Sequence, residues 1–125
     1  MKVAVTAQGK DRNSRVDPHF ARAHYFLVVD IDNDALAVCR NAGFRQTLQL
    51  AGTQVAGSLI SLGVQAVITE HIGPRAFGTL LSAGVRVFQA PSGTVAEAID
   101  LFKAGRLVEV SNANVGEHWP QFSNT

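Results

Sequence analysis

The sequence predicts an α/β domain in which a mixed β-sheet carries helices on both faces. Beyond residue 47, short apolar runs alternate with longer segments of helical periodicity, a pattern typical of βαβ units. Near the N-terminus, two apolar runs are joined by the short polar turn Asp32–Asp34, as in an antiparallel hairpin. The chain has 125 residues, of which 46% are hydrophobic, and this is enough for one domain with a real core.

Three strands are expected in the first forty residues. The first is Lys2–Ala7, and it is followed by a polar loop with no regular period. The second runs from about His24 to Ile31, and the third, Ala35–Arg40, returns after the polar turn. So short a turn predicts that the second and third strands pair in an antiparallel manner.

A helix and further strands are expected from the spacing of apolar residues in the rest of the chain. The first helix covers about Thr47–Leu62, where apolar residues recur at helical spacing and Gly63 follows the last of them. Buried strands are predicted at Val64–Thr69 and Val85–Ala90. The run RLVEV, residues 106–110, adds a short last strand.

Two more helices show clear start and stop signals. Pro74 stands at the first position of one helix and Gly84 just past its end, which is the usual asymmetry of these residues. Thr94 and Glu97 are in capping-box register at the start of the other, which ends at Gly105.

This order of elements predicts one three-layer α/β/α domain. Right-handed crossovers make the strands that contain Val3, Val67 and Val87 parallel neighbours. The domain is expected to cover residues 1–110, and residues 111–125 are interpreted as a tail.

Charge and cysteine content exclude several classes of protein. A net charge of +1 with 17% charged residues gives no electrostatic case for nucleic-acid binding. No apolar run approaches the roughly 18 residues that cross a bilayer. A single cysteine, Cys39, rules out an intrachain disulfide and metal sites made of cysteine alone. We therefore expect a soluble cytoplasmic protein without nucleic-acid or membrane partners.

Chemistry-bearing residues follow the predicted parallel strands. In open α/β sheets, ligands bind beyond the carboxyl ends of such strands, and His19, Arg22 and His71 fall there, as do helix starts at residues 73–75 and 92–94. Free N–H groups at those starts, together with arginine, favour an anionic ligand. Neutral imidazoles add the capacity to ligate a transition metal.

Structural roles are the plainer interpretation for other candidates. His24 alternates with Tyr25 within a strand, His118 lies in the tail, and Cys39 on an apolar strand is typical of a small core residue. A ribonuclease-H-type nuclease would need several converging carboxylates, and the first strand supplies none. The loop after it has one glycine and lacks dinucleotide or P-loop spacing, so the residues favour a binding protein over an enzyme.

Three segments in the same order resemble the dinitrogenase iron–molybdenum cofactor-binding family. They are PHFARAHYFLVVD, ITEHIGPRAFGTLLSAGVRVF and SGTVAEAIDLFKAGRL, and the likeness runs from residue 1 to about residue 110. The family includes nitrogenase cofactor carriers and accessory proteins, part of a cofactor-biosynthesis enzyme, and small orange proteins with a molybdenum–copper sulfide cluster. The resemblance implies a ribonuclease-H-like α/β/α fold.

The resemblance also implies the binding residues. The cluster-binding histidine of the family matches His19, and His71 is a second candidate metal ligand. The other positions that match the family's blocks are Arg22, Gly73, Pro74, Arg75, Ser92, Gly93 and Thr94. Two departures stand out: Ala21 replaces a glycine, and residues 41–54 replace a glycine-rich, often histidine-containing stretch.

The function implied by this resemblance is non-catalytic. The protein would carry or scaffold an anionic metal–sulfur cluster, either the iron–molybdenum cofactor or its precursor, or a molybdenum–copper sulfide, and deliver it to a client or cofactor-assembly protein. A cluster-free interaction or regulatory module on the same fold is the alternative, and a hydrolase or nuclease is a third hypothesis.

Overall fold

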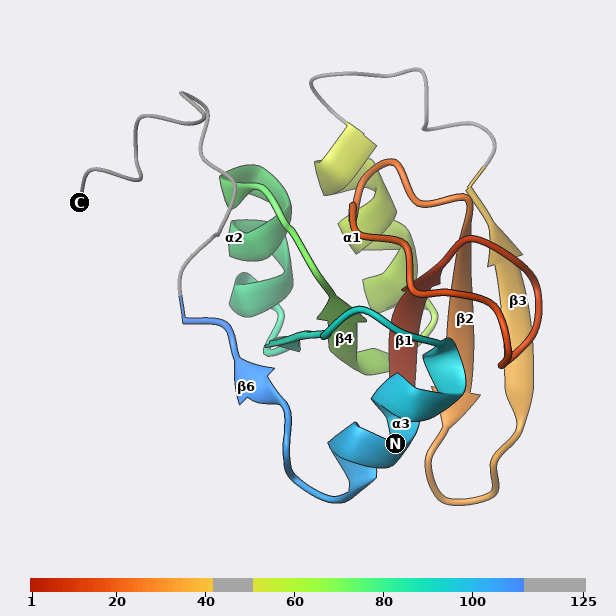
Figure 1. The fold of residues 1–125 in the computed structure, drawn as a ribbon. Coiled ribbons are helices and arrows are strands. Elements are labelled where there is room, and N and C mark those ends of the chain that lie inside the picture. The colour runs from red at the N-terminus through yellow and green to blue at the C-terminus, as the bar shows by residue number, and fades with distance from the viewer. Residues whose placement is uncertain (42–50, 112–125) are drawn as a thin grey trace.

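The structure, a computed structural model, describes residues 1–41 and 51–111. A six-stranded sheet carries helices on both faces (Figure 1). In chain order, the elements are β1 (Lys2–Ala7), β2 (Tyr25–Asp30), β3 (Leu36–Arg40), α1 (Ala51–Ser61), β4 (Val64–Thr69), α2 (Pro74–Ser82), β5 (Arg86–Gln89), α3 (Val95–Lys103) and β6 (Val108–Glu109). The predicted tail lies outside the described residues apart from Ser111, as does the predicted helical stretch 47–50.

The strands form one mixed sheet in the order β3-β2-β1-β4-β5-β6. Strands β1, β4 and β5 run parallel to one another. Strand β2 pairs antiparallel with both β1 and β3, and β6 pairs antiparallel with β5. Ala4 pairs with Val67, which pairs with Val87 on its other side. The predicted α/β fold with a mixed sheet is therefore confirmed, while the ribonuclease-H-like comparison stays a prediction.

The sheet has a separate core on each face. Helices α1 and α2 cover one face and α3 covers the other (Figure 1). Because side chains alternate along a strand, Ala4 lies in the α1 and α2 core and Val3 and Val5 in the α3 core. Gly52 allows close packing of the two helices on their shared face, since a Cβ there would lie 3.1 Å from that of Ala76.

Most sequence signals for helix ends are confirmed. Pro74 is the first residue of α2, and Thr94 and Glu97 form a complete capping box at α3. Gly84, after α2, has a φ of 79°, a conformation that favours glycine. The last strand is shorter than predicted and covers residues 108–109.

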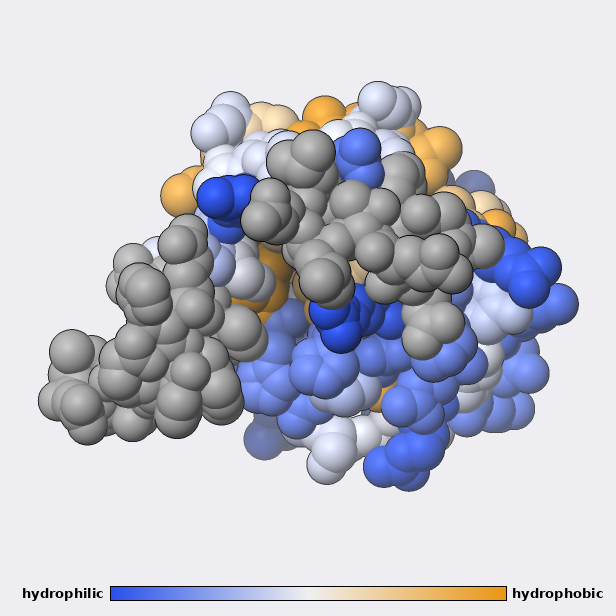
Figure 2. Space-filling model, turned by 90° about the horizontal axis from the view of Figure 1, so that it is seen from above, coloured by the Kyte–Doolittle hydropathy of each residue, from blue (hydrophilic) through white to orange (hydrophobic). Residues whose placement is uncertain are grey.

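The parallel strands bring three connections to one edge of the sheet. β1, β4 and β5 end at this carboxyl edge, and α1 and α2 both begin near the top of Figure 1, beyond the ends of β1 and β4. Figure 2 looks onto this end, where many hydrophilic residues are exposed. Within the described residues, no helix is long and apolar enough to cross a membrane.

Candidate functional site

Two histidines from distant parts of the chain lie side by side at the carboxyl edge. His19, in the loop after β1, forms an isolated parallel bridge with His71, which follows β4. The His71 N–H donates to the Pro18 carbonyl (2.8 Å), and the Phe20 N–H donates to the His71 carbonyl (3.1 Å). The two imidazole centroids are 6.2 Å apart and tilted by 38°. We refer to His19 and His71 as the histidine pair, and its place is fixed by backbone hydrogen bonds.

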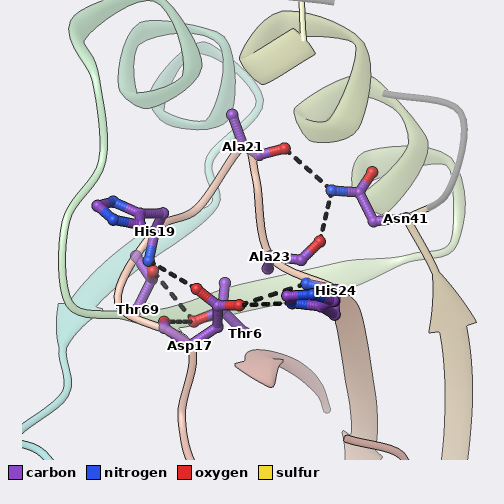
Figure 3. A network of polar contacts seen from close by, with 8 residues as sticks. All are labelled: Thr6, Asp17, His19, Ala21, Ala23, His24, Asn41 and Thr69. Atoms are coloured by element: carbon purple, nitrogen blue, oxygen red, sulfur yellow. Dashed lines mark hydrogen bonds and ion pairs between the residues drawn. The ribbon is translucent and has the colours of Figure 1, made fainter. Parts of the chain in front are cut away.

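A buried carboxylate holds the turn that carries His19. Asp17 is only 4% exposed, and its oxygens accept from the N–H of His19 (3.1 Å) and the N–H of His24 (3.4 Å). The His24 Nδ1 lies 3.3 Å from the same carboxylate (Figure 3). His24 therefore has the structural role predicted for it.

The same turn is anchored to the end of the sheet. The Asp17 N–H donates to the Thr6 carbonyl (2.9 Å), and the Thr6 hydroxyl returns a bond to the Asp17 carbonyl (2.7 Å). That hydroxyl also lies 3.1 Å from the hydroxyl of Thr69, at the end of β4. Both threonines are buried, so this link joins β1, β4 and the turn in the interior.

The side chain of Asn41, directly after β3, holds residues 21–23 in place. The buried Asn41 amide donates to the carbonyls of Ala21 (2.9 Å) and Ala23 (2.8 Å), as Figure 3 shows. Ala21 stands where the family that the sequence resembles has a glycine, but it needs no glycine-like conformation: Asp34 is the non-glycine residue with a positive φ in the described ranges. The substitution is accommodated without backbone strain.

Sequence reasoning missed Asp17, Thr6, Thr69 and Asn41. For Asp17 a signal existed, because Asp-Pro-His permits an Asx-turn, in which the side chain accepts the N–H two residues on. The other three bond to residues distant in sequence or to backbone carbonyls. No spacing rule finds such partners before the sheet order is known.

The His71 ring contains a buried polar atom without a partner. Its Nδ1 is inaccessible to solvent and meets no hydrogen-bond partner within the described residues. Such atoms are uncommon, because a buried polar group without a hydrogen bond costs roughly 1–3 kcal/mol. An imidazole nitrogen without a partner is also a potential metal ligand.

The start of α2 follows the histidine pair directly. Gly73 is the N-cap, Pro74 comes next, and within the described residues no side chain caps the helix. The first turn contains the exposed Arg75 and no acidic residue, and Arg22 is exposed in the loop that carries His19. Helix polarity and arginine charge both favour an anion at this end.

The start of α3 does not present the free N–H groups predicted for it. The N–H groups of Val95 and Ala96 donate to the carbonyls of Ser14 and Arg12, both at 2.9 Å. The Glu97 N–H donates to the Thr94 hydroxyl (3.2 Å). The prediction was wrong because the loop after β1 folds back over this helix and supplies carbonyl acceptors, a contact that the local sequence does not encode.

Residues 92–94 therefore hold the loop after β1 in place. The Val16 N–H donates to the Gly93 carbonyl (2.9 Å), and Thr94 forms a bridge with Arg15. Gly93 has a φ of 147°, and a Cβ there would lie 2.6 Å from the Glu97 carboxylate. Glycine is thus required by the capping box, and Ser92 beside it is exposed.

Cys39 lies away from the histidine pair. It is on β3, which is separated from β4 by β2 and β1. Burial raises the pKa of the Cys39 thiol. Its predicted role as a small hydrophobic residue agrees with its packing against the α1 and α2 core.

Comparison with known proteins places this arrangement in a family. An uncharacterized protein of Methanocaldococcus jannaschii is 32% identical over 110 residues, which cover 86% of this chain and 89% of the relative. The apo form of the orange protein from Desulfovibrio gigas superposes with a TM-score of 0.87 at 33% identity, covering 90% of this chain and 95% of that one.

A NifB-like protein from Thermotoga superposes with a TM-score of 0.80 at 40% identity, covering 89% of this chain and 94% of that protein. Residues 1–105 also match the profile of the family described as dinitrogenase iron–molybdenum cofactor. This match covers more than half of the chain, and it includes both histidines, the α2 start and the α3 start. The chain therefore belongs to the dinitrogenase iron–molybdenum cofactor family.

Proposed function

We propose that the protein is a non-catalytic carrier or scaffold for an anionic metal–sulfur cluster. The description of its family names the iron–molybdenum cofactor, and the similar solved structures include an orange protein and a NifB-like protein. The guest would be the iron–molybdenum cofactor or a precursor of it, or a molybdenum–copper sulfide. The histidine pair would supply its protein ligands.

The observation that carries this proposal is the histidine pair, whose two imidazole centroids lie 6.2 Å apart at the carboxyl edge. A single metal ion in a protein site usually takes three or four protein ligands, and the described residues contain no group of three His, Cys, Asp or Glu side chains placed to hold one. A cluster brings most of its ligands as sulfide. One or two imidazoles are then sufficient, and a pair fits a cluster better than a bare ion.

Charge at this end of the sheet suits the same guest. The uncapped start of α2 offers partial positive charge directly after His71, and the exposed Arg75 in its first turn adds a full charge. A site with few covalent ligands and a favourable field can bind an anion and still release it. That property is what delivery to a client or cofactor-assembly protein requires.

The alternative is a cluster-free interaction or regulatory module on the same fold. It is favoured by the bonded N–H groups at α3, which remove one of the two predicted anion-binding helix starts. The one cysteine of the chain, Cys39, lies on β3 away from the histidine pair, so it supplies no thiol to the site. These two features limit the site to His19, His71 and the α2 start.

Anaerobic reconstitution tests the proposal. Apo-protein would be mixed with a molybdenum–iron–sulfur cluster or with thiomolybdate and copper, desalted, and assayed for bound metal, sulfide and visible absorbance. We expect stoichiometric uptake by the natural sequence and at least about a tenfold weaker affinity for His19→Ala and for His71→Ala, since each loses a metal–imidazole bond.

His24→Ala is the matched control, because its ring is half exposed and contacts Asp17 rather than the histidine pair. This variant should retain cluster uptake within about twofold. Equal uptake by the natural sequence and His19→Ala would contradict the proposal. Absence of uptake by the natural sequence would favour the interaction module.

A further inference from the structure

The outer strand of the sheet has an open edge. The Asp30 N–H donates to the Ala35 carbonyl, and the Asn41 N–H donates to the His24 carbonyl. Because the bonded pairs of an antiparallel ladder alternate, Ala37 also turns its backbone groups toward β2. The backbone groups of Leu36, Val38 and Arg40 therefore point outward, and within the described residues no strand pairs with them.

Within residues 1–41 and 51–111, this edge shows little of the usual protection against pairing. Natural edge strands are commonly guarded by proline, inward charge or a bulge, but β3 reads LAVCR and pairs with β2 over five positions without a register shift. Leu36 is 37% exposed and Val38 is 45% exposed, and both project from the same face of the sheet. A regular apolar edge of this kind can accept another strand.

The opposite face of β3 is also partly uncovered. A groove of about 190 Å³ lies there, between the end of α1 and the hairpin. Its lining is mostly apolar and consists of Lys2, Val28, Asp30, Ala35, Leu36, Ala37, Cys39 and Leu62. An added strand would therefore gain contacts on both faces of the sheet.

We propose that β3 pairs with β3 of a second copy of this chain, antiparallel and about a two-fold axis at Ala37. In this register, Leu36 of each copy lies opposite Val38 of the other in a hydrogen-bonded pair. The two Ala37 residues meet at the axis in a non-hydrogen-bonded pair, where Cα atoms approach to about 4.5 Å. A small side chain suits that close approach.

Charge complementarity selects this register and the second copy as the occupant. The exposed Arg40 of one copy reaches the acidic turn of the other, where Asp34 is exposed and accepts from Lys103 at 2.9 Å. A register centred on Val38 would instead place Arg40 opposite Leu36. Arginine at one end of the strand and aspartate at the other make the edge complementary to itself.

The pairing leaves the carboxyl edges accessible. A two-fold axis across β3 reverses the strand direction, so the carboxyl edges of the two copies face opposite ways. The paired strands are short, and the interface is smaller than the roughly 800 Å² per partner of a standard stable complex. The dimer is thus expected to dissociate on dilution, and this inference is independent of cluster binding.

Sedimentation equilibrium of the full chain over a concentration series tests the association. We expect a monomer–dimer equilibrium, and Val38→Lys should lower the association constant about tenfold or more, because each dimer contains two such contacts. Leu81→Lys is the matched control: Leu81 is 56% exposed on α2, away from β3. It should leave the equilibrium unchanged.

Disulfide trapping tests the register. In a Cys39→Ser background, Ala37→Cys should form a linked dimer under mild oxidation at least about ten times faster than Val38→Cys, since only the former places two sulfurs at the axis. A natural chain that stays monomeric at every concentration would overturn the proposal. So would an unchanged dimer in Val38→Lys, or faster trapping by Val38→Cys.

Discussion

The starts of α2 and α3 differ in the hydrogen-bond partners of their first backbone N–H groups. At α3, the first N–H groups donate to the Ser14 and Arg12 carbonyls and to the Thr94 hydroxyl, and the Thr94 N–H donates to the Glu97 carboxylate at 2.8 Å. At α2, the N-cap is glycine, and no described side chain forms a capping hydrogen bond. Both helices have nine residues, so length does not explain the contrast.

The contrast indicates that the α3 start contributes to the stability of the fold, whereas the α2 start is left available for binding. The α3 start is bonded to the loop after β1 and thereby fixes the segment that leads to His19. The α2 start follows His71 and keeps its polarity for a guest. A disturbed α3 start is therefore expected to affect stability, and a disturbed α2 start to affect cluster uptake.

The largest effect on stability is expected from replacing Asp17, the buried carboxylate that holds the turn with His19. Asp17→Ala removes the buried acceptor of the His19 and His24 N–H groups, and buried donors without acceptors are costly. We expect the free energy of unfolding to fall by about 2 kcal/mol. Cluster uptake should also weaken, because His19 loses its fixed position. Urea unfolding and reconstitution measure the two effects.

Asp11→Ala is the matched control for this change. The Asp11 carboxylate accepts the Asn13 N–H at 2.9 Å, the same Asx geometry as at Asp17, but Asp11 is exposed. Its loss should cost about 0.5 kcal/mol or less. Equal losses for Asp11→Ala and Asp17→Ala would show that burial of Asp17 contributes nothing to the site.

A smaller effect on stability is expected when Glu97, in the first turn of α3, is protonated. The N–H of Thr94 and then its hydroxyl lower the pKa of Glu97 below its usual value of 4.5. A carboxylate with a lowered pKa stabilises the fold fully above its unfolded-state pKa, and this stabilisation is lost as pH falls through the folded-state pKa. The natural chain should therefore be more stable than Glu97→Gln at neutral pH, and the difference should shrink below about pH 4.5.

Thermal unfolding of both proteins between neutral and acid pH measures this difference. Carboxylates common to the two chains cancel in the comparison. Glu97→Gln should also bind the cluster as well as the natural chain, because the α3 start faces its own loop. A constant stability difference at all pH values would refute the role of the Glu97 charge, and a loss of uptake would refute the division between the two helix starts.

The fold was predictable because its signals are local. Pro74 at the start of α2, the Thr94–Glu97 box and the polar turn before β3 each mark an element within a few residues. The sheet order then follows from the handedness of crossovers and the tight hairpin. His19 and His71 were placed at one edge by the same topology, and the structure puts them side by side.

The support of the site was not predictable from spacing. Thr6 and Thr69 are 63 residues apart and meet only once β1 and β4 pair. Asn41 reaches carbonyls 18 and 20 residues earlier, and the carbonyls that cover α3 belong to a loop with no periodicity. Polar contacts between distant segments depend on the assembled sheet, so a sequence motif identifies candidate ligands more readily than the residues that position them.

The smallest change in stability should come from Gly73→Asp, which gives α2 the cap it lacks. Gly73 has an extended backbone (φ −79°, ψ 166°), and a Cβ there meets nothing within 4 Å, so the change brings no strain. An aspartate cap should raise the free energy of unfolding by a few tenths of a kcal/mol, about the difference between glycine and good N-cap residues. Its negative charge should weaken binding of an anionic cluster about tenfold.

Gly73→Asn adds a cap without charge, and it should keep most of the affinity. If Gly73→Asp bound the cluster as well as the natural chain, the polarity of the α2 start would have no part in binding, and the two helix starts would be functionally alike.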